Sequence, residues 1–292
     1  MVQTSIVRPV GILKDYIQSF ELREFNTFGV ELKKPIHAYH EILISLFIES
    51  QSTSFNGASD HEPSFIVQNN NRSFSGLMGL QSHMRGSFIF KGYFKIFNIQ
   101  FKPMGFSSIF KIPGAVIRNK FYDAEDLFKQ EINRLHEQLH GAKNMNEMVG
   151  CAEKFMEWKL SSNKHLWKND CLRKTSEFLH NHPNAYSMKQ LASHSNMSLK
   201  TFERNFTHHV GVPPKLYSRI RRFNQALQLK IYHPGLSWMD VCFKSGYYDQ
   251  MHLVKDFKTF TSQSPSAFFK NTPPVFENFS SVALTEKRKK NV

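Results

Sequence analysis

The sequence is poor in cysteine and has no long apolar run. Its 292 residues include 3 cysteines, Cys151, Cys171 and Cys242, which lie far apart and show no paired spacing. This spacing argues against both a disulfide framework and a cysteine-based zinc site. No stretch of about 18 apolar residues is present, and the N-terminus lacks the charged and then apolar pattern of a signal peptide. We therefore expect a cytoplasmic protein with no membrane segment.

Acidic residues are also in deficit, mostly in the second part of the chain. The sequence has 38 Lys and Arg against 24 Asp and Glu, which gives a net charge of +14. Residues 168–292 hold 19 of the cations and 8 of the acids, whereas residues 1–167 hold 19 and 16. A positive field attracts phosphate in a salt-dependent manner that does not depend on nucleotide sequence. The run Lys287–Lys290 adds to this field, and we expect residues 272–292 to form a basic, disordered tail.

One pattern occurs twice in this basic part. Residues 188–211 and 238–260 each read as a helix, a short polar break and a second helix, and the two copies lie about 51 residues apart. Ser198 and Asp249 stand where each second helix begins, and their side chains are of the type that caps a helix. Two short helices joined by a turn of roughly three to four residues form a helix-turn-helix motif.

The second helix of each motif has one apolar face and one polar face. Phe202 and Phe206 are four residues apart, as are Leu253 and Phe257, so each pair lies on one side of its helix and is expected to be buried. The remaining surface carries the residues that we predict to contact DNA: Lys200, Thr201, Glu203, Arg204 and Thr207 in the first helix, and Gln250, Met251, His252, Val254, Lys255 and Lys258 in the second. Arg204 and Lys255 occupy matching outward positions, and their cations suit the edge of guanine in a major groove.

These residues are expected to divide into two kinds of contact. Base readout is predicted for Lys200, Thr201, Arg204, Gln250, Met251, His252 and Lys255, with Glu203 and Val254 at the edges of the two faces. Lys258 and Lys215 sit at the far end of a recognition helix and near a helix start, so we expect them to contact the DNA backbone. The alternative is that both faces are ordinary solvated helix surfaces. Repetition of the pattern at a fixed spacing favours DNA contact.

These motifs belong to a longer ordered set of residues: Leu191, Ala192, Ser198, Phe202, Arg204, Phe206, Gly211, Pro214, Tyr217, Arg222, Ala226, Val241, Gly246, Tyr247, Asp249, Gln250, His252, Lys255, Phe257, Ser264 and Pro265. Through them, residues 171–269 resemble the DNA-binding domain of the AraC/XylS family of bacterial transcription regulators. The resemblance implies two recognition helices that read adjacent major-groove segments of double-stranded DNA. It also implies a long central helix between them, for which residues 213–231 have the apolar spacing, and contact with RNA polymerase.

The sequence departs from the pattern of this family at three places. Ser262 replaces a glycine after the second motif, Phe268 and Phe269 replace a closing tyrosine-arginine pair, and Cys242 replaces a small alanine. Cys242 is small enough to fit a contact between helices. Loss of the terminal arginine removes a cation, so we expect the second motif to bind more weakly, or less selectively, than the first.

The first part of the chain has a strand-like pattern. Runs rich in Ile, Phe and Val at residues 41–48, 64–68, 87–91 and 95–102 are separated by clusters of Asn, Gly and Ser. Such runs are typical of the strands of a small β-barrel or sandwich, and a short helical segment follows at residues 106–110. The order resembles the β-rich N-terminal domain of unknown function that often precedes an AraC-type domain, through Gly79, Phe101, Pro103, Gly105 and the segment 123–128.

Two helices are expected after the strands, at residues 123–139 and 145–160. The first carries Phe128, Ile132, Leu135 and Leu139 at the alternating steps of a coiled-coil seam. In sensor domains of this family such helices often form the dimer, so the resemblance implies a homodimer. Packing of both helices against their own barrel is the alternative, and the sequence leaves it open.

The predicted fold class is therefore α+β, in two domains. A β-rich sensor or dimerisation domain with C-terminal helices is expected at residues 1–160, followed by a linker at 161–167. An all-α domain with two helix-turn-helix motifs is expected at 168–271, before the tail at 272–292.

A barrel beside a DNA-binding domain suggests a regulator whose interior takes a small-molecule effector. The alternatives are an effector-independent regulator controlled by a protein partner and a metal-dependent barrel enzyme with an appended DNA-binding domain. His37 and His40 beside Glu41 are candidate ligands for such an enzyme, but no third ligand follows at a recognisable spacing. We therefore predict no catalytic residue, no metal and no cofactor.

Overall fold

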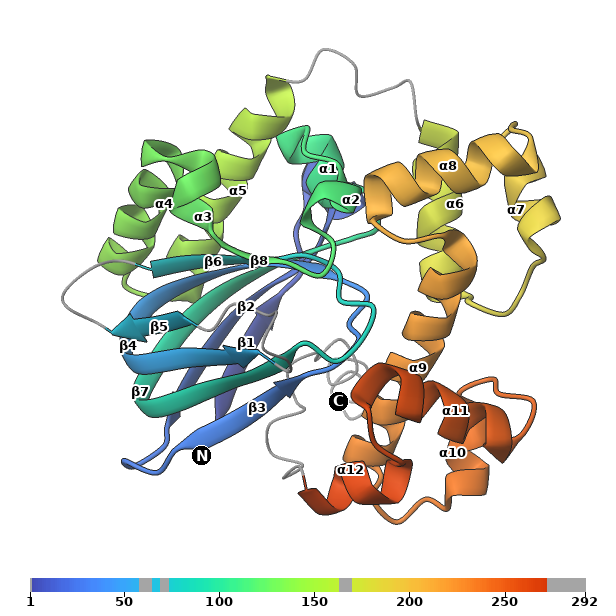
Figure 1. The fold of residues 1–292 in the computed structure, drawn as a ribbon. Coiled ribbons are helices and arrows are strands. Elements are labelled where there is room, and N and C mark those ends of the chain that lie inside the picture. The colour runs from blue at the N-terminus through green and yellow to red at the C-terminus, as the bar shows by residue number, and fades with distance from the viewer. Residues whose placement is uncertain (1, 58–64, 69–73, 163–169, 272–292) are drawn as a thin grey trace, which may run out of the picture.

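The computed structural model describes residues 2–57, 65–68, 74–162 and 170–271, which form a sheet-containing part and a helical part side by side (Figure 1). This arrangement confirms the expected α+β class. In the portion of the chain that is described, no helix combines the length and the apolar character needed to cross a bilayer.

In the described residues, the first part contains eight strands and six helices: β1 (Gln3–Val7), η1 (Gly11–Asp15), β2 (Ile17–Asn26), β3 (Leu32–Ile36), β4 (Ile42–Gly57), β5 (Phe65–Gln68), β6 (Phe74–Met78), β7 (Gly86–Phe101), α1 (Gly105–Phe110), α2 (Gly114–Ile117), β8 (Phe121–Asp123), α3 (Ala124–Phe128), α4 (Gln130–Gly141) and α5 (Met145–Ser161). The second part holds α6 (Asp170–Asn181), α7 (Met188–His194), α8 (Leu199–Val210), α9 (Pro214–Tyr232), α10 (Trp238–Lys244), α11 (Gln250–Thr261) and α12 (Pro265–Asn271).

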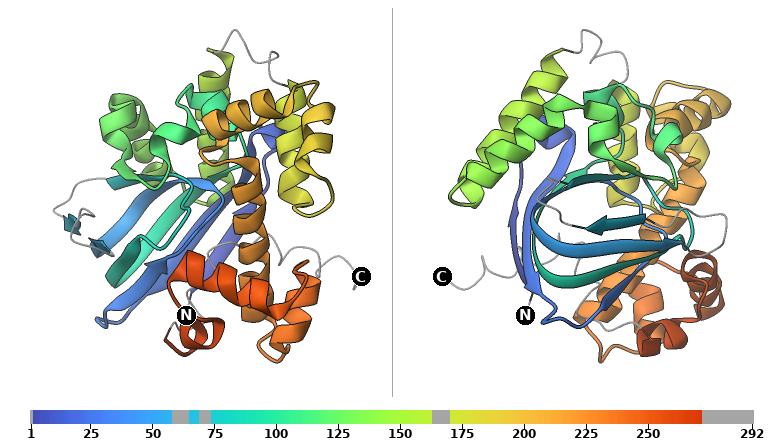
Figure 2. Two further views of the ribbon diagram at one scale, coloured as in Figure 1. Left: turned by 45° about the vertical axis from the view of Figure 1, so that its right-hand side comes forward. Right: turned by 60° about the vertical axis from the view of Figure 1, so that its left-hand side comes forward.

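The sheet is built around β4 and β7, which are each 16 residues long and run antiparallel. Strands β2 and β3 pair with different stretches of β7, and β6 and β5 pair with different stretches of β4. The main path runs β1-β2-β7-β4-β6-β8. Among the described residues no ladder joins β1 to β8, so the sheet is strongly curved but open, and the expected barrel does not close (Figure 2).

The two runs predicted at residues 87–91 and 95–102 belong to one strand, β7. Gly92 lies between them with a φ of 105°, and a Cβ at this position would lie 1.7 Å from Oε1 of Gln51. This position of β7 therefore favours glycine, because residues with a Cβ rarely adopt such a φ. The run at 64–68 corresponds to β5, although Ser64 itself lies outside the described residues.

Strands β1, β2, β3, β6 and β8 were not predicted from the sequence. The reason is clearest in β2, where Ser19, Glu21 and Arg23 are all at most 2% exposed. These polar residues are buried in place of the apolar ones that mark a strand. Glu21 forms an ion pair with Arg23 and accepts a hydrogen bond from Gln100 Nε2 at 2.9 Å, so the buried charges are partnered.

The two faces of β7 are both buried, for different reasons. Phe97, Ile99 and Phe101 belong to the main apolar core that the sheet shares with the helices. On the other face, Asn98 and Gln100 are 4% and 2% exposed and line a cavity on the concave side of the sheet. The sequence predicted one apolar side for this strand, and the structure shows that the other side faces an internal space.

The predicted helix at 123–139 is divided into α3 and α4. Lys129 between them has a φ of 51°, so the helix cannot run through this residue. The seam residues are buried in the core of their own domain, with Ile132 and Leu139 at 0% exposure. The seam is therefore buried by packing against the sheet of the same chain, which was the alternative to a dimer contact. The homodimer stays a prediction.

Helix α9 connects the two ends of the helical part. It begins at Pro214, where the missing N–H costs nothing, and confirms the central helix predicted at 213–231. Figure 1 shows α6, α7 and α8 at one end of α9 and α10, α11 and α12 at the other. Residues 163–169 and 272–292 lie outside the described residues, so the predicted linker and tail, with the domain boundaries, stay predictions.

Candidate nucleic-acid interface and the adjoining cavity

Helices α7 and α8 form the first helix-turn-helix motif, and α10 and α11 form the second. The first helix of each motif begins with a reciprocal capping box, made by Ser187 with Gln190 and by Ser237 with Asp240. Each box satisfies two N–H groups that the helix itself leaves without an acceptor. The two motifs therefore share the capping box at the start of their first helices as well as the helix-turn-helix pattern.

The second helix of each motif begins at the predicted cap. The hydroxyl of Ser198 accepts a hydrogen bond from the Thr201 N–H at 3.2 Å, and the carboxylate of Asp249 accepts one from the His252 N–H at 2.8 Å. Both predicted caps are confirmed. The start of each second helix is thus fixed relative to the turn before it.

The turns of the two motifs also share an unusual backbone conformation. Asn196 has a φ of 54° and Gly246 a φ of 75°, and both follow the last residue of the preceding helix by two positions. Asparagine and glycine tolerate this left-handed region best. At Gly246 a Cβ would also lie 2.2 Å from Nδ2 of Asn184, which donates a hydrogen bond to the Gly246 carbonyl.

The four predicted anchors are fully buried. Phe202, Phe206, Leu253 and Phe257 each have 0% exposure and share one apolar core with α9. Because these side chains hold α8 and α11 against the central helix, the opposite faces of the two helices point to solvent.

Most of the predicted DNA-contacting residues lie on those outer faces. Lys200, Glu203, Arg204, Gln250, Met251, His252, Lys255 and Lys258 are exposed, whereas Thr201, Thr207 and Val254 are half-buried. The structure thus places the two matched cations, Arg204 and Lys255, on the exposed surfaces of the two recognition helices.

Three of the predicted residues make local contacts within their own helices. The hydroxyl of Thr207 donates to the Glu203 carbonyl at 2.6 Å, and the Thr201 hydroxyl accepts from Ser198 at 2.9 Å. His252 Nδ1 lies 2.9 Å from the Asp249 carboxylate. Thr201 and His252 contact the caps at the helix starts, and Thr207 contacts the preceding turn of its own helix, so these groups are less available for DNA than the longer Lys and Arg side chains.

Sequence reasoning missed an apolar surface on the second motif. Tyr248 is 88% exposed, Met251 82% and Phe243 63%, at the end of α10 and the start of α11. Tyr248 and Phe243 were overlooked because their neighbours Tyr247 and Cys242 carry the buried pattern. Apolar side chains can contact the methyl group of thymine, so this surface adds candidate contacts to a motif with fewer cations than expected.

A buried carboxylate holds α11 against α9. Asp256 accepts from Arg219 at 2.7 Å and lies 3.4 Å from Nη2 of Arg222, and the hydroxyl of Tyr247 donates to it at 3.1 Å. Arg222 also lies over the Tyr247 ring, 4.2 Å from its centre. This network fixes the orientation of the second recognition helix on the central helix.

Residues 37–41, which we call the interdomain strap, bind the helical part through the backbone. The Ala38 N–H donates to the Phe260 carbonyl at 3.1 Å, at the end of α11. The side chain of Asn224, on α9, donates to the Ala38 carbonyl at 2.9 Å and accepts from the His40 N–H at 3.3 Å. The sheet domain is therefore attached to the helix that carries both motifs.

A second contact joins the sheet domain to the first motif. Gly114 approaches the end of α8 so closely that a Cβ would lie 2.5 Å from the His209 carbonyl. Nη1 of Arg118 donates to the Gly211 carbonyl at 3.4 Å, and Ser107 Oγ lies 3.2 Å from His209 Nδ1. Burial and the neighbouring His208 lower the pKa of His209 to about 4.

A cavity lies between the concave face of the sheet and α9. Apolar side chains form most of its wall: Pro35, Ile36, Leu43, Phe47, Met78, Phe88, Phe90, Ile96, Phe121, Leu227 and Ile231. Polar groups are contributed by Lys34, His37, Tyr39, Ser45, Asn98, Gln100, Asn224 and Gln228. Both domains thus line one space, which the sequence did not reveal because its walls come from distant segments.

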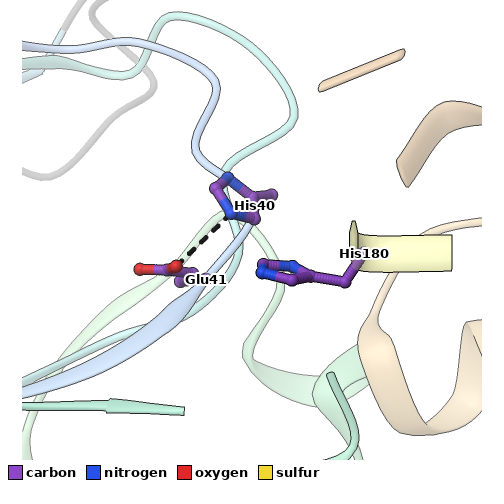
Figure 3. A group of neighbouring side chains, drawn as sticks. All are labelled: His40, Glu41 and His180. Carbon is purple, nitrogen blue, oxygen red and sulfur yellow. Dashed lines mark ion pairs between the residues drawn. The ribbon is translucent and has the colours of Figure 1, made fainter. Parts of the chain in front are cut away.

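Two titratable residues of the strap, His40 and Glu41, contact a histidine of the helical part. His40 and Glu41 of the strap meet His180 at the end of α6, and one ligand atom of each lies within 4.8 Å of those of the other two (Figure 3). His37 does not join this group, because its ring packs against Phe223 and Phe268. The sequence offered no third ligand near His40 and Glu41. The structure supplies one, His180, from the helical part.

Comparison with known proteins gives one family match and several distant structural likenesses. Residues 191–271 match the family model described as a helix-turn-helix domain. No curated protein matches the chain.

Three crystal structures illustrate the structural likenesses. An apo single-substitution variant of ToxT from Vibrio cholerae is 11% identical and covers 85% of this chain and 96% of its own, with a TM-score of 0.47. Wild-type ToxT from Vibrio cholerae with bound unsaturated fatty acid is 11% identical and covers 86% and 95%, with a TM-score of 0.45. The AraC-like transcriptional activator CuxR is 14% identical and covers 77% and 86%, with a TM-score of 0.27.

The family match spans both motifs and the central helix between them. Its region contains the two recognition helices, their caps and the buried anchors described above. Residues 191–271 therefore form a helix-turn-helix domain.

Proposed function

We propose that this protein is a sequence-specific regulator in which α8 and α11 read adjacent major-groove segments of double-stranded DNA. The observation that carries the proposal is the matched pair of recognition helices, each capped at its start, anchored by buried residues and exposed on its opposite face. Two helices that read one side of B-DNA lie about one helical turn apart, roughly 34 Å. Because α8 and α11 both pack on α9, the distance between these two helices is fixed, as such binding requires.

The eleven predicted residues keep their proposed roles. Arg204 and Lys255 are the principal base-reading cations, and Lys258 and Lys215 contact phosphates. Tyr248, adjacent to the start of α11, is added as an apolar contact because it is 88% exposed.

The same proposal includes control by a small molecule in the cavity between the sheet and α9. Leu227, Gln228 and Ile231 of α9 form one wall, so a bound molecule contacts the helix that joins the two motifs. The remaining walls are largely apolar with a few amide and hydroxyl groups, a lining typical of small-molecule sites. The cavity volume is about 100 Å³, which favours a small, mainly apolar molecule.

Filling the cavity tests this control. Leu43→Trp places an indole into the cavity, because Leu43 lines its wall on β4. Leu127→Trp, at an exposed position of α3, is the matched control. We expect Leu43→Trp alone to change the affinity for a selected DNA site or to abolish the response to a ligand found by thermal-shift screening. Equal behaviour of the two variants would assign the regulation to a protein partner and would remove the cavity from the mechanism.

Other parts of the proposal follow from the family resemblance. A homodimer and contact with RNA polymerase are expected of an AraC-type regulator, and sedimentation and two-protein binding measurements test them directly. The cytoplasm is the compartment in which such a regulator meets bacterial DNA. Catalysis plays no part in this proposed function.

A further inference from the structure

The group formed by His40, Glu41 and His180 is buried and joins the two domains. The three residues are each 4% exposed, and Figure 3 shows their side chains converging from the strap and from α6. We propose that they bind one divalent transition-metal ion of the zinc class, which ties the sheet domain to the helix-turn-helix domain.

The first support is an unsatisfied nitrogen. Nδ1 of His40 lies 2.6 Å from Oδ1 of Asn224, an acceptor whose identity is fixed because Nδ2 of the same amide donates to the Ala38 carbonyl. Nδ1 therefore carries a proton. The other ring nitrogen, Nε2, is buried and makes no hydrogen bond.

The direction in which this nitrogen points is the second support. Nε2 of His40 lies 3.4 Å from Oε1 of Glu41. In a neutral imidazole with its proton on Nδ1, the lone pair of Nε2 would face a carboxylate oxygen, and the two would repel each other. Either a cation between the two atoms or a proton on Nε2 removes this repulsion. Ligand atoms on one zinc ion, with bonds of about 2.0–2.1 Å, lie roughly 3.3 Å apart, which matches the observed separation.

Each of the three ligands is held by a neighbour through its other polar atom. His40 is oriented by Asn224, Oε2 of Glu41 accepts from the Tyr39 hydroxyl at 2.6 Å, and Nδ1 of His180 lies 2.8 Å from the Tyr217 hydroxyl. The last contact occupies Nδ1 of His180 and leaves its Nε2 for the metal. Outer hydrogen bonds of this kind orient the ligands in protein metal sites.

The donor set determines the class of ion. Two imidazole nitrogens and one carboxylate oxygen suit Zn²⁺ and its neighbours in the first transition row better than Mg²⁺ or Ca²⁺, which prefer oxygen ligands. A solvent molecule from the adjoining cavity, which Tyr39 and Asn224 also line, can complete the coordination.

The site explains how a sheet residue and a helix residue far apart in sequence become coupled. His40 precedes β4 and His180 ends α6, so an ion shared by them resists separation of the two domains. The alternative is a buried imidazolium–carboxylate pair between His40 and Glu41 with no metal and with His180 as a packing residue. The two accounts differ in whether the ion binds and whether His180 takes part.

Zinc titration of the metal-free full-length protein separates them. We expect calorimetry to show one high-affinity Zn²⁺ per chain and an increase in melting temperature on binding. His180→Gln should weaken binding by more than about 100-fold, beyond the usual effect of losing an outer-shell partner. His182→Gln, which removes an exposed histidine beyond the end of the same helix, should leave the affinity unchanged.

A second measurement keeps the test decisive where a variant folds poorly. Co²⁺ bound to the wild-type protein should give the visible absorption of a low-coordinate site and should be displaced by one equivalent of Zn²⁺. The proposal is overturned if the wild-type protein and folded His180→Gln bind Zn²⁺ equally, or if bound Co²⁺ has the spectrum of a six-coordinate surface ion. None of these readouts uses DNA, so their outcome is independent of the proposed regulatory function.

Discussion

At the scale of single residues, the recognition helices place a cation at the same outward point of each motif. Arg204 and Lys255 are both exposed, and both stand six residues after the cap of their helices. The buried anchors leave little freedom in how each helix faces outward. The packing beneath each helix therefore determines which side chains are presented to solvent, including those that we propose to read DNA.

Replacement of Arg204 should reduce specific binding more than general binding. We expect Arg204→Ala to cost about 1–3 kcal/mol at a selected DNA site and much less on random DNA, because a base contact is lost. Fluorescence anisotropy at matched salt measures both affinities. Arg134→Ala, at an exposed position on α4, is the control and should change neither. Equal losses on both DNAs would reassign Arg204 to the phosphate backbone.

Ser262 is the residue at which the family's glycine is missing, and the structure shows its consequence. It ends α11 with a φ of 61°, a left-handed conformation that costs a residue with a Cβ more than it costs glycine. Gly211 ends α8 with a φ of 108° and carries no such cost. The departure seen in the sequence is therefore a local strain at the end of the second recognition helix.

Restoring the glycine should stabilise the protein. We expect Ser262→Gly to raise the free energy of unfolding by about 1 kcal/mol. Urea denaturation of the wild type, Ser262→Gly and Ser262→Ala measures the change. Since Ser262→Ala keeps a Cβ in the same conformation, it should remain close to the wild type. A glycine variant no more stable than the alanine variant would show that α11 ends without strain.

At the scale of secondary-structure elements, the orientation of α11 depends on a polar contact with α9. Asp256 is 4% exposed and bonds to Arg219, Arg222 and Tyr247. Aromatic packing on α9 is common to both motifs, with ring centres 5.5 Å apart for Phe206 and Tyr217 and 5.0 Å apart for Phe257 and Phe223. The buried carboxylate is an additional contact of the second motif, so its loss is expected to affect that motif first.

Removing the charge of Asp256 should loosen the second motif. We expect Asp256→Asn to lower the free energy of unfolding by about 2 kcal/mol, because two arginines lose their buried partner. The same variant should lose recognition of the half-site read by α11 and keep the other half-site. Asp126→Asn, on the exposed face of α3, is the control. Loss of both half-sites together would mean that the two motifs act as one unit.

The elements that sequence could predict are those with local signals. The caps Ser198 and Asp249 and the i,i+4 anchors fix both motifs within short segments, and the structure confirms them. Strand β2 was missed because Glu21 and Arg23 are buried as a pair, which no local pattern indicates. The division of α3 from α4 at Lys129 was missed for the same reason, since no glycine or proline marks the break.

The cavity and the histidine group could not be predicted, because each depends on long-range contacts. Leu43 and Leu227 become neighbours across the cavity only when the sheet packs on α9. His180 looked like the end of a helix, and its place beside His40 depends on how the strap docks.

At the scale of the whole molecule, the sheet domain contacts both ends of the DNA-binding domain. The strap bonds to α9 and to the end of α11, while Gly114 and Arg118 contact the end of α8. A change in the sheet domain can therefore reach both recognition helices.

The contact at His209 makes the assembled structure sensitive to acid. Its folded pKa of about 4 lies below the ordinary histidine value of about 6.5, so the unfolded chain binds a proton that the folded chain does not. The stability is fully present above pH 6.5 and is lost as the pH falls toward 4. The lowered pKa of His136, caused mainly by burial, acts in the same direction.

His209→Gln should remove part of this pH dependence. We expect the free energy of unfolding of the variant to fall less between about pH 6.5 and 4.5 than that of the wild type. Urea denaturation at several pH values within this window measures the slope. His233→Gln, at an exposed position just after α9, should retain the wild-type slope. An unchanged slope for His209→Gln would place the acid sensitivity at the other buried histidines.

The central claim is that both motifs read DNA, and selection of bound sequences from a random duplex pool tests it most directly. The full-length protein is used at about 150 mM salt, where binding through phosphates alone is weakened. The account predicts enrichment of two short motifs about ten base pairs apart, one lost with Arg204→Ala and the other with Lys255→Ala. Enrichment of a single motif that neither substitution changes would contradict the account. So would the absence of any enriched motif, both in the presence and in the absence of a ligand for the cavity.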